Sequence, residues 1–101
     1  MVAKDDEERV MLQNPNTGRD DLRIKRSIYD PVRTAILDAI TEAGELRFSD
    51  LNDEVERRTP PKLWEDSSVA WYTVSVKLDL EAKGLIVKEG KPQRLRLGAK
   101  K

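Results

Sequence analysis

Apolar residues in the middle of the chain recur at the three- and four-residue spacing that is typical of one face of an α-helix. The residues that follow this spacing are Val32, Ile36, Leu37, Ile40 and Ala43. Asp30 is a good N-cap, and Pro31 suits the first helical position because the N–H that it lacks has no partner there. Gly44 can adopt the left-handed conformation of a C-cap. The pattern therefore predicts a helix from Asp30 to Gly44 with one face in the core.

A shorter apolar stripe, formed by Leu51 and Val55, predicts a second helix. Ser49 is the expected N-cap of this helix, and residues 59–61 (Thr-Pro-Pro) are expected to end it. Leu46 to Phe48, just before it, have the pattern of a very short strand. The second helix is thus expected to follow the first after a brief extended segment.

Residues 67–83 have two interpretations. Val74, Val76, Leu78 and Leu80 alternate with polar residues as in a strand, but the same stretch also forms two apolar stripes at helical spacing. The stretch is longer than a usual strand, and it ends in Lys83-Gly84 as helices commonly do. We predict a third helix, capped by Asp66 or Ser67 and running to about Lys83.

The C-terminal part of the chain predicts a β-hairpin. Residues 85–88 are extended in pattern, residues 89–92 (Glu-Gly-Lys-Pro) form a turn, and residues 93–97 alternate polar and apolar. The expected fold class is α+β, with three helices followed by this hairpin over residues 30–97. Residues 1–29 are expected to be a partly disordered arm, and residues 98–101 a basic tail. Within the arm we expect a turn at residues 14–18, and a brief strand or a staple onto the body at Val10–Leu12.

Residues 78–86 (Leu-Asp-Leu-Glu-Ala-Lys-Gly-Leu-Ile) resemble the junction of recognition helix and wing in bacterial winged-helix transcription regulators. In those proteins the corresponding sequence is Leu, two residues, Leu-Glu, two residues and then Gly-Leu-Ile. This chain matches from Leu80-Glu81 to Gly84-Leu85-Ile86, but one residue rather than two separates Leu78 from Leu80. The junction needs a glycine because the helix must stop sharply and pass straight into a strand. The resemblance implies a three-helix winged helix-turn-helix with a C-terminal β-hairpin wing. The chain is also similar to a set of short, uncharacterised bacterial proteins with an Asn-Pro-Asn segment and a tryptophan in the third helix.

In the regulators that this chain resembles, the third helix enters the major groove of double-stranded DNA and the wing touches phosphates or the minor groove. Carried over to this chain, Thr73 and Lys77 are expected, beside Glu81, on the exposed edge of the third helix. The cations that the wing would bring to phosphates are Lys88, Lys91, Arg94 and Arg96.

The second apolar stripe of the third helix is expected to be an interface. It consists of Trp71, Val74 and Leu78. The N-terminal segment around residues 10–12, that around residues 24–28, or a second copy in a homodimer would cover it. Trp64 and Trp71 are expected in the core or an interface rather than stacked on bases, since no basic residues are interleaved with them.

Two functions remain open. The first is a DNA-binding transcription regulator, dimeric, that contacts phosphates through its wing. The second is a winged-helix module for protein interaction or dimerisation without DNA binding. The predicted recognition edge has no Arg, Asn or Gln, the side chains that most often read bases, and the link between the second and third helices is long and contains Pro60-Pro61. The neutral edge and the acidic body favour the second function, while the long link weakens the resemblance. The resemblance favours the first function, and a DNA-binding regulator is therefore our prediction, with the interaction module as the alternative.

Composition narrows the chemistry further. The chain has no cysteine and no histidine, so disulfides, thiolate chemistry and zinc-finger ligand sets are excluded. We expect no enzyme activity, no metal and no cofactor, because neither a phosphate-binding loop nor a nucleophile with its base is recognisable. No membrane-spanning stretch is visible, and the expected location is the cytoplasm.

Charge is balanced overall but unevenly placed along the chain. Residues 83–101 contain seven Lys or Arg and one acid, a net charge of +6, which residues 1–82 balance. A basic end on an acidic body suggests an anionic partner or a self-complementary contact. A tail that only keeps the protein soluble remains the alternative.

Overall fold

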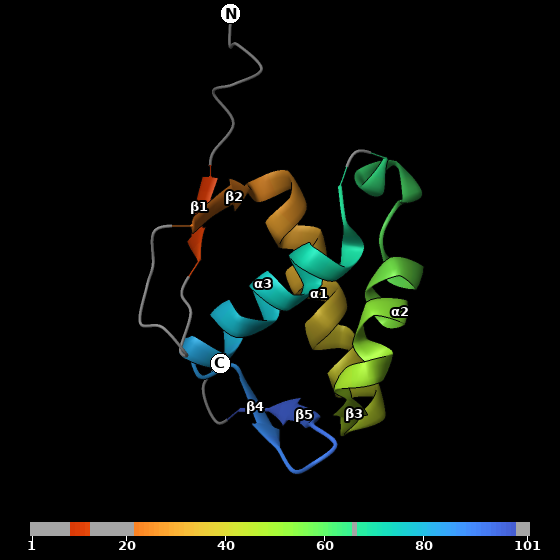
Figure 1. The fold of residues 1–101 in the computed structure, drawn as a ribbon, viewed down its shortest axis with the longest axis vertical. Coiled ribbons are helices and arrows are strands. Elements are labelled where there is room, and N and C mark those ends of the chain that lie inside the picture. Colours follow the sequence, from red (N-terminus) through yellow and green to blue (C-terminus); the bar gives the residue numbers. More distant parts are fainter. Residues whose placement is uncertain (1–8, 13–21, 66, 99–101) are drawn as a thin grey trace, which may run out of the picture.

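The chain folds into three helices followed by an antiparallel hairpin, in the part that the computed structural model describes (residues 9–12, 22–65 and 67–98; Figure 1). The elements are β1 (Arg9–Leu12), β2 (Leu22–Lys25), α1 (Arg26–Ala43), β3 (Leu46–Arg47), α2 (Phe48–Arg58), the 3-10 helix η2 (Pro61–Trp64), α3 (Val69–Ala82), β4 (Ile86–Glu89) and β5 (Arg94–Leu97). The predicted α+β fold class is confirmed, and the arrangement is winged-helix-like.

One hydrophobic core lies where the three helices meet the hairpin. Its fully buried members include Ile36 and Ile40 of α1, Leu51 of α2 and Leu80 of α3. The hairpin closes the core from below in Figure 1, through Leu95 and its neighbours. The predicted core faces of the first two helices are therefore confirmed, except at Ala43, which is exposed.

The hairpin belongs to a small sheet in the strand order β3-β5-β4. Ile86 pairs with Leu97, and Lys88 with Leu95, while Leu95 also pairs with Leu46 on its other side. Because side chains alternate between the faces of a strand, Leu95 points into the core and Arg94 and Arg96 point outward. The short third strand thus ties the start of α2 to the hairpin.

The first helix begins earlier than its capping pattern predicts. It starts at Arg26, so that Asp30 is not its N-cap and Pro31 lies inside it. Proline lacks an N–H and so removes one backbone hydrogen bond from the helix. Burial outweighs that loss, because the added turn carries Tyr29, which is buried and continues the apolar stripe to Val32.

The third helix is confirmed over residues 69–82, and the strand interpretation of this stretch is wrong. Ser68, one residue later than predicted, caps it by accepting a hydrogen bond from the backbone N–H of Trp71 at 3.2 Å. At the other end Gly84 has a φ of +77°. The N–H of Leu85 then donates to the carbonyl of Leu80 at 2.9 Å, which satisfies the end of the helix and directs the chain into β4.

The predicted N-terminal arm contains an antiparallel ribbon. In it β1 pairs with β2, with Arg9 opposite Lys25 and Met11 opposite Arg23. Val10 and Leu12 are buried, so the expected strand at Val10–Leu12 is confirmed. The expected turn at residues 14–18 and the tail beyond residue 98 lie outside the described residues.

Candidate interaction surface

The third helix turns a different face to solvent from the one that the sequence predicts. Thr73 is 0% exposed and Lys77 is 3% exposed, so the prediction that they form an accessible edge for bases is wrong. Thr73 and Lys77 lie on the same side of the helix as Val76 and Leu80, which pack in the core. The opposite side forms what we call the outer face of α3, made of Trp71, Val74, Ser75, Leu78 and Ala82.

The outer face of α3 is apolar. Trp71 is 46% exposed and contacts the ring of Tyr72 edge-on, at 4.9 Å between centroids. Val74 and Leu78 are half-buried, and Ala82 is exposed. The sequence predicts that the N-terminal segments or a second copy cover this face. The β1–β2 ribbon does contact α3, but it leaves much of Trp71 in contact with solvent.

The buried Lys77 is neutralised within the fold. Its ammonium lies 2.5 Å from the carboxylate of Glu81 and 4.8 Å from the centroid of the Phe48 ring. The two side chains are only 4% and 7% exposed. Lys88 of the wing approaches the same carboxylate at 3.5 Å. Glu81 therefore joins α3 to the wing. It also pairs with Lys88, one of the cations that the sequence predicts to contact phosphate.

A second buried polar cluster joins α3 to α1. Asp79, which is fully buried, accepts hydrogen bonds from the hydroxyl of Tyr29 at 2.6 Å and from the ammonium of Lys83 at 2.9 Å. Burial raises the pKa of the Tyr29 phenol, and the hydrogen bond to Asp79 raises it further. Burial lowers the pKa of Lys83, but its hydrogen bonds to Asp79 and Tyr29 outweigh that effect and leave it raised.

Sequence reasoning missed the Tyr29–Asp79–Lys83 cluster, since 50 residues separate Tyr29 from Asp79. The available signal was Asp79 itself, an acid placed between the core-facing positions of a helix. Such an acid needs a partner when it is buried. The cluster holds α1 and α3 together rather than facing a solvent-filled site.

The wing carries cations on its outward side, most of them paired. Arg94 contacts Glu45 at 3.3 Å, and Arg96 contacts Glu89 at 3.1 Å. Lys91 is exposed at the turn, and no carboxylate in the described part of the chain pairs with it. Pairs this exposed contribute little to stability and exchange readily with other anions.

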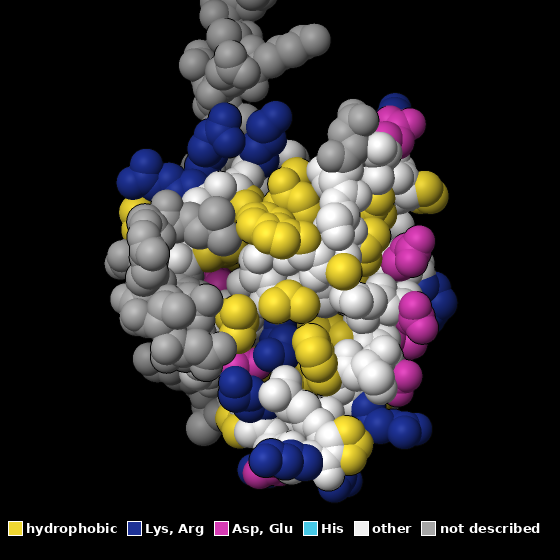
Figure 2. Space-filling view, viewed as in Figure 1, with side chains coloured by type: hydrophobic (Ala, Val, Ile, Leu, Met, Phe, Trp, Pro, Cys, Tyr) yellow, Lys and Arg dark blue, Asp and Glu magenta, His cyan; other side chains and the backbone are white. Residues whose placement is uncertain are grey.

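The outward side of the ribbon carries a second group of cations, which we call the ribbon cations: Arg9, Arg23 and Lys25. Within the described residues none of the three pairs with a carboxylate, and Arg9 stands directly opposite Lys25. Figure 2 shows Lys and Arg side chains above the hydrophobic side chains in the middle of this view, and more of them below, over the wing. The outer face of α3 thus lies between two basic regions.

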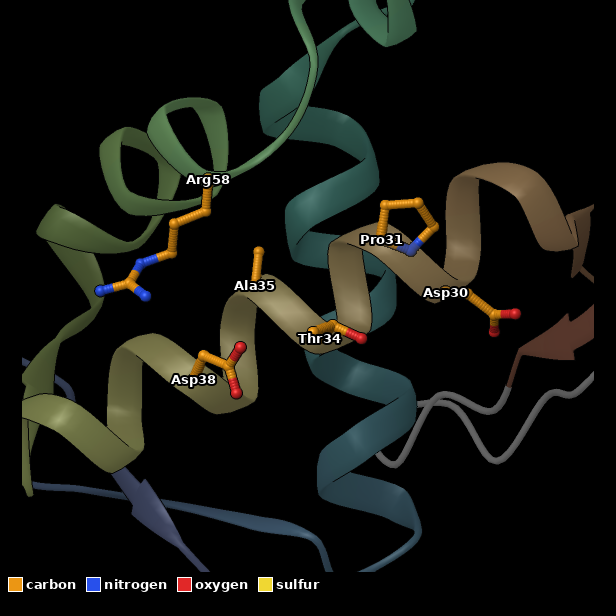
Figure 3. A pocket seen from close by; sticks show the side chains of 6 residues that line it. All are labelled: Asp30, Pro31, Thr34, Ala35, Asp38 and Arg58. Carbon is orange, nitrogen blue, oxygen red and sulfur yellow. The ribbon is translucent and has the colours of Figure 1, made fainter.

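A shallow hollow between α1 and α2 has no arrangement that suggests catalysis. Figure 3 shows Asp30 and Asp38 at opposite ends of the side chains that line it. Arg58 at its edge donates to Glu42 at 2.8 Å and to Glu54 at 3.0 Å, and these hydrogen bonds lower the pKa of both carboxyls. Among the described residues, no group of three or more acids is placed to hold a metal ion.

Fold and surface together define a winged-helix-like α+β domain with an apolar outer face on its third helix. The chain belongs to the family described as a family of unknown function, DUF6958, whose model matches residues 9–95. No curated protein and no solved structure matches the chain. In the part of the chain that the structure describes, no helix combines the length and the apolar character needed to cross a bilayer.

Proposed function

We propose that this chain is a non-catalytic interaction module that binds another protein through the outer face of α3. The observation that carries the proposal is the exposure of Trp71 at 46% on a face whose other members are Val74, Ser75, Leu78 and Ala82. Tryptophan is enriched among the residues that dominate binding energy at protein interfaces. Scattered exposed apolar residues are common, but an aromatic anchor beside further apolar residues is typical of a docking site.

The chemistry of the same face is poorly suited to reading DNA. Base edges are recognised by hydrogen-bonding side chains, and this face offers only the Ser75 hydroxyl and the indole N–H of Trp71. Lys77, the basic side chain that was expected to contact bases, is buried and forms an ion pair with Glu81. A protein surface with its own apolar residues complements this face better than the edges of stacked bases.

A photo-crosslinking residue placed at position 71 tests the proposal. We expect covalent adducts in cells whose mass nucleases leave unchanged and which proteases degrade completely, because position 71 would lie inside an interface with another protein. The same crosslinker at Asp53, an exposed position on α2, is the matched control and should give no such adduct. Electrophoresis before and after each digestion is the measurement.

Three results would count against the proposal. Adducts whose mass nucleases reduce to about that of the chain alone would point to DNA. Adducts of twice the mass of the chain would point to the homodimer that the sequence also suggests. Equal protein adducts from position 71 and from Asp53 would mean that the contact is not specific to the outer face of α3.

Duplex DNA is the second candidate, favoured by the exposed cations of the wing and by the resemblance to bacterial winged-helix transcription regulators. Lys91 is unpaired within the described residues, and Arg94 and Arg96 are about half exposed. If the wing binds phosphates, affinity for random duplex must fall steeply with salt.

For the DNA candidate we expect only weak binding of random duplex at low salt and none at about 150 mM salt, where the Debye length is about 8 Å. Fluorescence anisotropy on a labelled duplex is the measurement. The variant R94A/R96A, compared with R33A/R47A, shows whether residual binding involves the wing. Tight binding at moderate salt that R94A/R96A removes would favour the DNA function over our proposal.

A further inference from the structure

The two basic regions beside the outer face of α3 restrict what kind of protein it binds. This inference rests on the proposed function and names the class of partner. We propose that the partner docks an acidic amphipathic helix along the outer face of α3, with its apolar stripe on Trp71 and Leu78. Its carboxylates would then meet the ribbon cations at one end and the wing at the other.

The partner segment is a helix because α3 offers no free backbone groups beside its apolar face. A buried backbone must have its hydrogen bonds satisfied, and a strand or loop laid on a helix would leave its own N–H and C=O groups without partners. A helix satisfies them internally and presents side chains only. From Trp71 to Ala82 the face extends for about 17 Å at 1.5 Å per residue, which is about three helical turns of a partner.

The partner is acidic because of the ribbon cations. Arg9 and Lys25 are directly opposite each other, and like charges in that position are destabilising. Arg23 lies on the same outward side of β2, two residues from Lys25, and within the described residues none of the three has a carboxylate partner. A carboxylate brought by a partner would offset this repulsion and add an attraction.

The wing supplies a second set of cations at the other end of the face. Lys91 is unpaired within the described residues, and the contacts of Arg94 and Arg96 with acids are exposed and weak. Acidic side chains at both ends of the partner helix would fix its position along α3. An apolar face alone would not do so.

A second copy of the chain fits this surface less well. In a twofold contact through the outer face of α3, each basic end would meet either its own equivalent or the other basic end. Cations would then face cations whichever way the two helices run. The homodimer is therefore an outcome of the test rather than the proposal.

Selection from a displayed peptide library provides the test, with the full chain as bait. The peptides are 18-residue helices with a fixed apolar stripe and with Glu, Gln or Lys at each polar position. We expect enriched peptides to be rich in Glu, to lose binding to the Trp71→Ser variant and to bind less tightly as salt is raised. A second copy of the chain as prey should not be enriched.

Charge variants of the bait show which cations of this chain contribute to the affinity for the acidic peptide. The variant R23Q/K25Q removes two ribbon cations, and R33Q/R47Q removes two cations from α1 and β3, so both change the net charge equally. We expect R23Q/K25Q to weaken the best peptide by about threefold to tenfold, as two exposed ion pairs would, and R33Q/R47Q to leave it within about twofold. Circular dichroism confirms that each bait is folded.

Failures of the two proposals give different results. Enriched peptides that need Trp71 but are neutral or basic would overturn the acidic partner and leave the interaction module standing. Equal losses in R23Q/K25Q and R33Q/R47Q would also overturn the acidic partner. No enrichment at all would overturn the acidic helical partner. Enrichment that is independent of Trp71, or enrichment of the second copy, would overturn both proposals.

Discussion

Replacing Asp79 with alanine is expected to lower the free energy of unfolding by about 2 to 4 kcal/mol, since it leaves buried polar groups unpaired. The carboxylate is fully buried and accepts hydrogen bonds from Tyr29 at 2.6 Å and Lys83 at 2.9 Å. In the variant the buried Tyr29 hydroxyl has lost this acceptor. Lys83 is about one third exposed, so its ammonium can turn to water, which keeps the loss below that of a fully buried ion pair. Urea denaturation followed by circular dichroism measures the change.

Two variants separate the contributions within this cluster. Tyr29→Phe removes the hydroxyl and keeps the ring, and it should cost about 1 kcal/mol, the net value of one hydrogen bond. The double variant Y29F/D79A should then lose less than the sum of the two single losses, since the hydroxyl left unpaired by Asp79→Ala is absent. Strictly additive losses would mean that the contact between Tyr29 and Asp79 does not stabilise the fold.

The second large effect concerns the ion pair between Lys77 and Glu81. We expect Glu81→Leu to cost about 3 kcal/mol, the usual result of removing one partner of a buried ion pair. The remaining Lys77 ammonium would be buried over the ring of Phe48 without a carboxylate. Lys77→Met should be comparably costly, because it leaves the Glu81 carboxylate with only the more distant Lys88.

The double variant K77M/E81L is expected to be within about 1 kcal/mol of the parent, since apolar residues of similar volume often replace a buried ion pair without loss. A cycle of the two single variants and the double variant in urea gives the coupling free energy. As a matched exposed pair, Arg26 and Asp30 should show a coupling below about 1 kcal/mol. If K77M/E81L lost as much as the two single variants together, the ion pair would not be a coupled unit in the folded protein.

Several local features of the fold follow directly from the order of residues. The end of α3 is one, because Gly84 can adopt the positive φ that the turn into β4 requires. The alternation in residues 93–97 is another, and it predicts Leu95 as the inward residue of its strand. The candidate interface of Trp71, Val74 and Leu78 also came from the helical spacing, although what covers it stays a prediction.

The start of α1 and the orientation of α3 did not follow in the same way. Asp30 and Pro31 are an apt local signal for a helix start, yet burial of Tyr29 against Asp79 of α3 extends the helix back to Arg26. That contact involves residues far apart in the chain, so no local pattern contains it. A favourable N-cap stabilises a helix by about 1 kcal/mol, which is less than the free energy gained by burying a large side chain.

The sequence by itself determined that α3 is a helix with two apolar stripes, that it ends at Gly84 and that a hairpin follows. Only the tertiary structure decided that Thr73 and Lys77 lie inside with the first stripe, and that the second stripe leaves Trp71 largely in contact with solvent. Thr73 and Lys77 are polar, so apolar periodicity alone does not place them in the core. Packing against α1 and α2 places Thr73, Val76 and Leu80 inward, and Lys77 is tolerated there because Glu81 neutralises it. Trp71 is left facing solvent for that reason.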